Sequence, residues 1–220
     1  MRRVIFSLLF VIAAMLPGTA AVAAQGTDCA DLETYLQTVD AAVIEHTMTL
    51  VQSEEWIEAA EAASAIMQEG GDLENITEDA LAPVIELWSI PAQVLDEIPD
   101  DEIPADAQAL HDSAGEHWVI MADLLAAIGR DGPGAIFMYI AEVDRVTNEN
   151  WSAQESVRSN CADVVSGYED QLATLTEMFS VMDSGDLSPI IEVTAEDLEG
   201  LGVMYLFFAD EDDVTATPAS

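Results

Sequence analysis

Two histidines are the side chains in this sequence best suited to chemistry, because each falls on the apolar stripe of a predicted long helix. His46 is followed by Met48, and His117 is followed one helical turn later by Met121. Imidazole and thioether groups together form a donor set for copper, and such pairs also hold haem in helical bundles. The competing interpretation is that the histidines are hydrogen-bonded core residues and the methionines fill the core. We favour the core interpretation and keep a copper or haem site at these four residues as the alternative.

Clusters of carboxylates offer a second kind of metal chemistry. They occur at Asp96–Glu97 with 100–102, at Asp183 with Asp186, and at 210–213. None has the alternating ligands and terminal glutamate of an EF-hand calcium loop. We therefore expect weak, nonspecific binding of divalent cations, with a dedicated calcium site as the alternative.

Catalytic motifs are missing from the chain. There is no Gly-x-Ser-x-Gly, no His-Glu-x-x-His, no phosphate-binding glycine loop, no Cys-x-x-Cys-His for covalent haem and no Glu-x-x-His pair of di-iron bundles. The adjacent Asp144 and Arg145 are interpreted as an ion pair that ties two helices together rather than as a catalytic couple. The sequence thus predicts a protein without catalytic activity.

The first 24 residues have the three parts of a secretory signal peptide. A basic start at Arg2 and Arg3 precedes an apolar run over 4–16, and small residues follow up to Ala24. The run is shorter than the roughly 20 residues that cross a bilayer, so the mature chain is predicted to carry no transmembrane segment. Export places the only two cysteines, Cys29 and Cys161, in an oxidising compartment. We predict a disulfide between them, with two free buried thiols as the alternative.

The charge of the chain limits its partners. It has 43 Asp and Glu residues against 5 Lys and Arg, which gives a formal net charge of -38. Half of its residues are nevertheless hydrophobic, which argues against an acidic disordered protein. No basic face for phosphate binding can be built, so nucleic acid is excluded as an expected partner. Cations or a basic protein or peptide are the partners that this charge favours.

Spacing of apolar residues by three and four positions runs through most of the chain and predicts helices, while no segment shows the alternation of a strand. We predict one domain over 25–209, an all-α bundle of about four long helices with one or two shorter ones, and a disordered acidic tail rich in Thr, Pro and Ala over 210–220. The predicted helices cover 29–67 (as one helix or as two joined near Ser53), 77–88, 91–98, 104–128, 135–148, 151–182 and 194–208.

The functional expectation combines export, charge and fold class. We expect a secreted or otherwise extracytoplasmic, highly acidic helical protein that binds a partner or has a structural role, in the cell envelope, the periplasm or outside the cell. The alternative is an extracellular copper- or haem-binding bundle that uses the histidines and methionines of the helix stripes.

Overall fold

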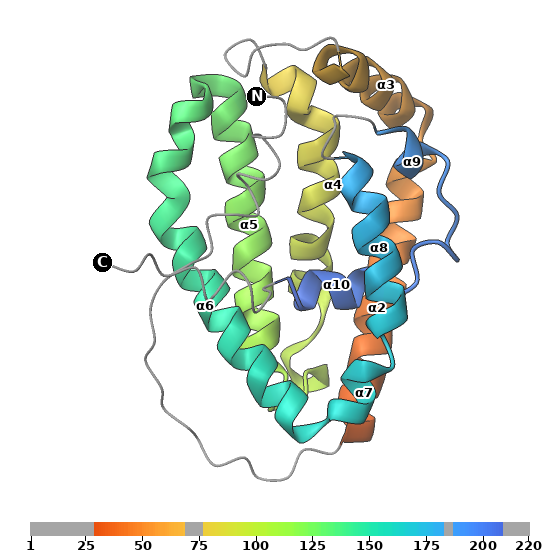
Figure 1. The fold of residues 1–220 in the computed structure, drawn as a ribbon, viewed down its shortest axis with the longest axis vertical. Coiled ribbons are helices and arrows are strands. Elements are labelled where there is room, and N and C mark those ends of the chain that lie inside the picture. Colours follow the sequence, from red (N-terminus) through yellow and green to blue (C-terminus); the bar gives the residue numbers. More distant parts are fainter. Residues whose placement is uncertain (1–28, 69–76, 183–186, 209–220) are drawn as a thin grey trace.

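The computed structural model describes residues 29–68, 77–182 and 187–208. All regular elements within these ranges are helices, so the all-α prediction is confirmed (Figure 1). The predicted signal peptide over 1–24, the predicted tail over 210–220 and the carboxylate clusters at 183–186 and 210–213 lie outside the described residues.

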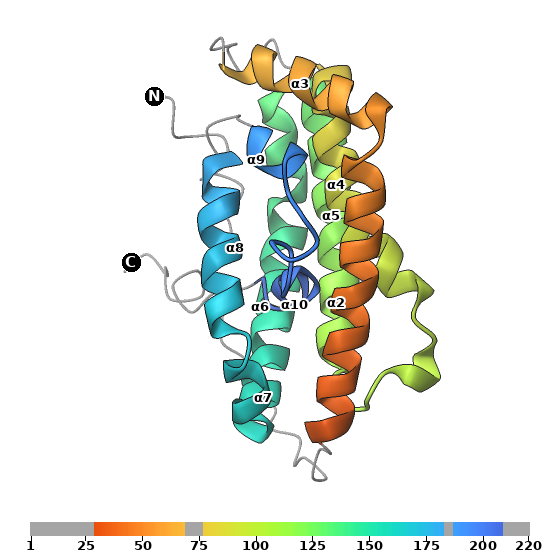
Figure 2. The same cartoon turned by 90° about the vertical axis from the view of Figure 1, so that its right-hand side faces the viewer.

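Four long helices form the main body, and shorter helices join and cap them (Figures 1 and 2). The long helices are α2 (Cys29–Val51), α4 (Glu78–Glu97), α5 (Gln108–Asp131) and α6 (Ile136–Asn160). The others are α3 (Glu54–Gln68), which crosses one end of the bundle, then α7 (Ala162–Ser166), α8 (Glu169–Met182), α9 (Ser188–Ile191) and α10 (Leu201–Leu206), with single 3-10 turns at η2 (Asp100–Glu102) and η3 (Pro133–Ala135).

The first half of the chain follows its sequence pattern closely. The predicted apolar stripe of α2 is buried from Leu32 to Val43. In its last two turns the prediction is wrong, because Thr47 and Val51 are buried while His46 is only half-buried. The chain breaks near Ser53, as one of the two predicted alternatives requires, and the Ser53 hydroxyl accepts the Trp56 backbone N–H at 3.2 Å to start α3. Thr77 caps α4 in the same way by accepting the N–H of Ala80.

The predicted helix break before Pro91 is wrong. α4 continues through Pro83 and Pro91, although Pro91 has no N–H to bond the Leu87 carbonyl. Leu87, Pro91 and Val94 are all buried in the contact of α4 with its neighbours. Their burial compensates for the lost hydrogen bond, which a local pattern does not register.

Further helix boundaries differ from prediction in the second half. The helix predicted to begin at Pro104 begins at Gln108. α6 runs without interruption through 148–151, and the chain turns instead at Cys161, between α6 and α7, and again at 167–168, between α7 and α8. The helix predicted to begin at Thr194 begins at Leu201, because Asp197 binds the Thr194 backbone N–H and hydroxyl in a local turn. Gly200 then takes a left-handed conformation with φ of 88°, which any other residue adopts with strain.

The short helix α10 lies across the centre of the bundle, between α2 and α8 (Figure 2). Leu198, Leu201, Val203 and Leu206 are completely buried there. The C-terminal apolar run is thus a core element.

Side chains of three long helices hold both ends of α10. The Asp40 carboxylate of α2 accepts the N–H groups of Gly200 and Gly202 at 3.0 and 2.8 Å. At the other end, the Trp118 indole donates to the Tyr205 carbonyl at 2.8 Å, and the Asn150 amide donates to the Leu206 carbonyl at 2.9 Å. These bonds satisfy backbone groups that a helix cannot pair internally at its ends.

Candidate functional site

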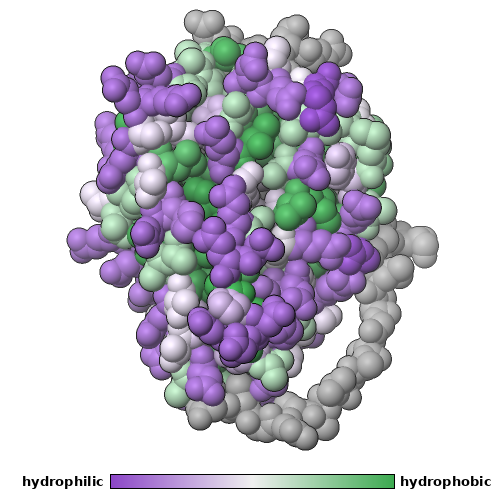
Figure 3. All heavy atoms as spheres, turned by 180° about the vertical axis from the view of Figure 1, so that it is seen from behind, coloured by the Kyte–Doolittle hydropathy of each residue, from purple (hydrophilic) through white to green (hydrophobic). Residues whose placement is uncertain are grey.

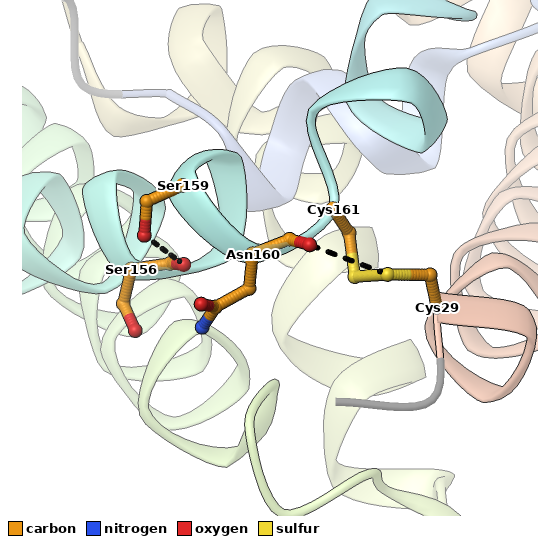
Figure 4. Close-up of a disulfide and its surroundings, with 5 residues drawn as sticks. All are labelled: Cys29, Ser156, Ser159, Asn160 and Cys161. Atoms are coloured by element: carbon orange, nitrogen blue, oxygen red, sulfur yellow. Dashed lines mark hydrogen bonds between the residues drawn. A yellow bond between two sulfur atoms is a disulfide. The ribbon is translucent and has the colours of Figure 1, made fainter. Parts of the chain in front are cut away.

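The predicted disulfide is present. Cys29 and Cys161 have their sulfur atoms 2.00 Å apart and their Cα atoms 5.6 Å apart (Figure 4). The bond joins the first residue of α2 to the turn between α6 and α7, across 132 positions of sequence. It brings the start of α2 beside α7, while further along the bundle α10 separates α2 from α8.

His46 lies half-exposed on α2 with a partner that the sequence pattern does not reveal. Its Nδ1 atom is 2.9 Å from the Ala42 carbonyl oxygen, which can only accept, so Nδ1 carries a proton. Its Nε2 atom is 3.6 Å from a carboxylate oxygen of Glu97, at the end of α4. Met48, two positions further along α2, is half-buried against the core, and residues two apart on a helix do not face the same side.

A groove of about 490 Å³ lies beside His46, between α2 and α4. The exposed carboxylates of Glu45 and Glu86 line it together with His46. Apolar side chains, among them Ile85 and the buried Ile90, line it as well. The lining of the groove therefore combines carboxylates with apolar side chains.

His117 has a different environment, inside an aromatic cluster. Its ring stacks on that of Phe208 at 3.7 Å between centroids, and Trp118 meets it edge-on at 5.1 Å. Its Nδ1 atom is buried without a hydrogen-bond partner, and burial lowers the pKa of His117 to about 3. Met121 is buried one turn further along α5, so both residues occupy the core positions that the helix stripe predicts.

The described structure does not bring the two predicted His–Met pairs into one site. The neighbours of His46 are Ala42 and Glu97, whereas those of His117 are Trp118 and Phe208. Within 29–68, 77–182 and 187–208, no three His, Cys, Asp or Glu side chains converge as metal ligands would. The copper or haem site at His46, Met48, His117 and Met121, and a dedicated calcium site, remain predictions.

Tyr35 and His111 form a polar pair that the sequence analysis missed. The Tyr35 hydroxyl lies 2.9 Å from Nδ1 of His111. Burial raises the pKa of Tyr35 and lowers that of His111, so the phenol donates to a neutral imidazole. The only sequence signal is the position of Tyr35 on the α2 stripe beside Leu36. A second groove, of about 390 Å³, adjoins Tyr35 and carries the carboxylates of Asp31 and Asp101.

The few arginines engage only a small part of the acidic surface. Arg145 ties α6 to α5 through Glu116 and also pairs with Glu149. It does hold two helices together as predicted, but its partner is Glu116 instead of Asp144. Arg130 pairs with Glu78, and Arg158 lies over the rings of Trp151 and Phe207. Hydrophilic residues consequently spread over the whole face seen in Figure 3, with apolar residues between them.

Comparisons with protein-family models, with curated protein sequences and with solved structures find no match to the chain. Among the described helices, none combines the length and the apolar character that crossing a membrane requires. The proposal about function therefore rests on the excess of carboxylates, the two grooves and the half-exposed His46.

Proposed function

We propose that this protein is a secreted, non-catalytic helical binding module whose partner is cationic, either a basic protein or peptide or small cations. The observation that carries the proposal is the ratio of 43 carboxylates to 5 basic side chains around a fully packed core. Three arginines in the described ranges cannot neutralise such a surface. A surface of one sign attracts partners of the opposite sign and raises their association rate.

The groove between α2 and α4 supports a basic peptide as the partner in particular. A lysine or arginine side chain has an apolar stem and a charged head. The stem can cover apolar surface while the head lies beside a carboxylate. Ile85 and Ile90 offer the apolar surface, and Glu45 and Glu86 offer the charge. The groove thus has both components that one basic side chain needs.

The proposal is tested by titrating the mature chain with a labelled decalysine peptide at about 50 mM and 500 mM salt and recording fluorescence anisotropy. We expect binding at low salt that weakens strongly at high salt, and no binding of a decaglutamate peptide. Glu45→Gln/Glu86→Gln should weaken binding severalfold. Glu33→Gln/Glu155→Gln, which removes the same charge from exposed sites outside the groove, should weaken it less. Absence of decalysine binding at low salt would refute the proposal.

One observation favours metal binding as a second candidate function. The Nδ1 atom of His46 donates to the Ala42 carbonyl, so Nε2 is the ring nitrogen available to a metal, and it lies 3.6 Å from a Glu97 carboxylate oxygen. Imidazole together with carboxylate suits Zn²⁺ or Cu²⁺. The donor set that we propose therefore pairs His46 with Glu97 instead of Met48.

Zinc and copper titrations followed by calorimetry separate the two donor sets. We expect His46→Gln and Glu97→Gln each to weaken metal binding, and Met48→Leu to leave it unchanged. The opposite pattern, with loss in Met48→Leu and none in Glu97→Gln, would restore the thioether set. Elemental analysis and an absorption spectrum of protein purified without a tag test for copper and for haem directly.

A further inference from the structure

Three exposed apolar side chains, two of them strongly exposed, lie together at the start of α6. Phe137 is 80% exposed, Met138 is 65% exposed and Ile140 is 37% exposed. The only other exposed large apolar side chains in the described ranges are Ile66 and Val119. We call Phe137, Met138 and Ile140 the α6 patch. Its concentration within one helical turn distinguishes it from the scattered apolar exposure of ordinary surfaces.

The fold does not require apolar residues at these positions. Ile136 and Tyr139 are half-buried against the core and already anchor the first turn of α6. Further along the helix, burial falls on Val143 and Val146, at the spacing of the inward face. Phe137 and Met138 point away from that face, where most of this chain has polar residues. Because these apolar side chains do not contribute to the core, a contact with another molecule explains them better than the fold does.

The charges near the α6 patch select among possible contacts. Asp131 ends α5 just before the turn, and Glu142 lies one helical turn after Met138; both are exposed. The nearest arginines, Arg130 and Arg145, are already paired with glutamates. A second copy of the chain, with a net charge of -38, would be repelled, as would an anionic membrane. A partner with apolar residues flanked by Lys or Arg is complementary.

The geometry points to the α6 patch as the docking surface for a cationic amphipathic helix of a partner protein or peptide. A helix with apolar residues at positions i, i+3 and i+4 presents a stripe that packs over Phe137 and Met138. Its basic residues on either side of the stripe then lie beside Asp131 and Glu142. This inference rests on the proposed function. It adds a second contact site for the basic partner, separate from the groove between α2 and α4, and the helical form of the segment that binds there.

Two synthetic peptides of equal charge test the inference on the mature chain. One is a 14-residue helix with Leu at i, i+3 and i+4 positions and Lys elsewhere, and the other has Ser in place of each Leu. Burial of the patch should make the Leu peptide bind about 10-fold more tightly than the Ser peptide near 150 mM salt. Phe137→Ser/Met138→Ser should abolish this difference, while Ile66→Ser, at an exposed site on α3, should preserve it.

The outcomes separate the inference from the proposed function. If neither peptide binds, the cationic partner itself is refuted. If the double variant keeps the 10-fold preference, binding occurs but the α6 patch is not its site. Self-association in sedimentation velocity that disappears in the double variant would assign the patch to a second copy. Phe137-dependent binding to phosphatidylcholine vesicles would assign it to a membrane surface; either result overturns the inference. Unchanged melting of the variants confirms that they fold.

Discussion

Replacement of Gly202 by alanine should dislodge α10 from the centre of the bundle. A Cβ atom at Gly202 would lie 2.6 Å from the Asp40 Cα and 2.9 Å from the Val39 carbonyl carbon. These are backbone atoms of α2, so no side-chain rotation relieves the clash. Restoring an ordinary carbon–carbon contact moves the two helices apart by about 1 Å. That shift lengthens the two hydrogen bonds that Gly200 and Gly202 donate to Asp40, which measure 3.0 and 2.8 Å in the parent.

The cost has two sources. Overpacking of a tight core site costs about 1–3 kcal/mol. Weakening of the two Asp40 hydrogen bonds adds about 0.5–1.5 kcal/mol for each bond that is lost. We therefore expect Gly202→Ala to reduce the free energy of unfolding by about 2–4 kcal/mol, which lowers the Tm by about 5–15 °C in a chain of this length.

Equilibrium unfolding in urea measures the effect, with tryptophan fluorescence as the signal because the Trp118 indole donates directly to the Tyr205 carbonyl. Gly134→Ala is the matched control, since a Cβ there meets nothing within 4 Å. It should leave stability within about 0.5 kcal/mol of the parent. Equal unfolding midpoints for Gly202→Ala and Gly134→Ala would refute the close packing of α10 on α2.

Three further predictions concern the disulfide, His117 and the surface charge. Reduction, or Cys29→Ala/Cys161→Ala, should lower stability by up to about 5 kcal/mol given the 132-residue separation, and identical melting with and without reductant would contradict this. The pKa of His117 is lowered to about 3, so the unfolded chain takes up a proton below pH 6.5 that the folded chain does not, and stability falls as pH falls from 6.5 towards 3. Between pH 7 and 5 the loss in free energy of unfolding due to His117 amounts to about 2 kcal/mol. His117→Leu should therefore lose less stability than the parent over that interval. Equal losses would show that His117 is not the group responsible. Added salt should raise the Tm by screening carboxylate repulsion, and a flat response would contradict that repulsion.

Features that depend on local periodicity were predictable from the sequence. The α2 stripe up to Val43, the helix break near Ser53 and the Thr77 cap all follow from residues within a few positions of one another. The disulfide was predictable for another reason, because a chain with two cysteines permits only one pairing and the predicted export favours its oxidation. The stripe likewise places His117 and Met121 in the core correctly.

Features decided by distant segments were not predictable. Pro91 remains inside α4 because the helix is buried on its neighbours. The position of α10 in the core depends on Asp40, which accepts the N–H groups of Gly200 and Gly202 from 160 or more positions away. The partner of His46 is Glu97, on another helix, so spacing on α2 directs attention to Met48 instead. Tyr35 and His111 also lie on different helices, 76 positions apart, so no local spacing pairs them.

The acidic residues of this chain serve the fold and the surface in different ways, and Asp40 shows the difference. Burial raises the pKa of Asp40, so its charge is costly, yet both of its oxygens accept N–H groups that fix α10 in the core. A few exposed carboxylates also hold local structure, as Glu116 and Asp197 do, but most have no basic partner and repel one another, which opposes folding. Screening should therefore affect the two properties oppositely: salt stabilises the bundle while it weakens binding of a cationic partner. A partner that neutralises the exposed carboxylates should itself raise the Tm, and most strongly at low salt, where both its affinity and the repulsion it relieves are greatest.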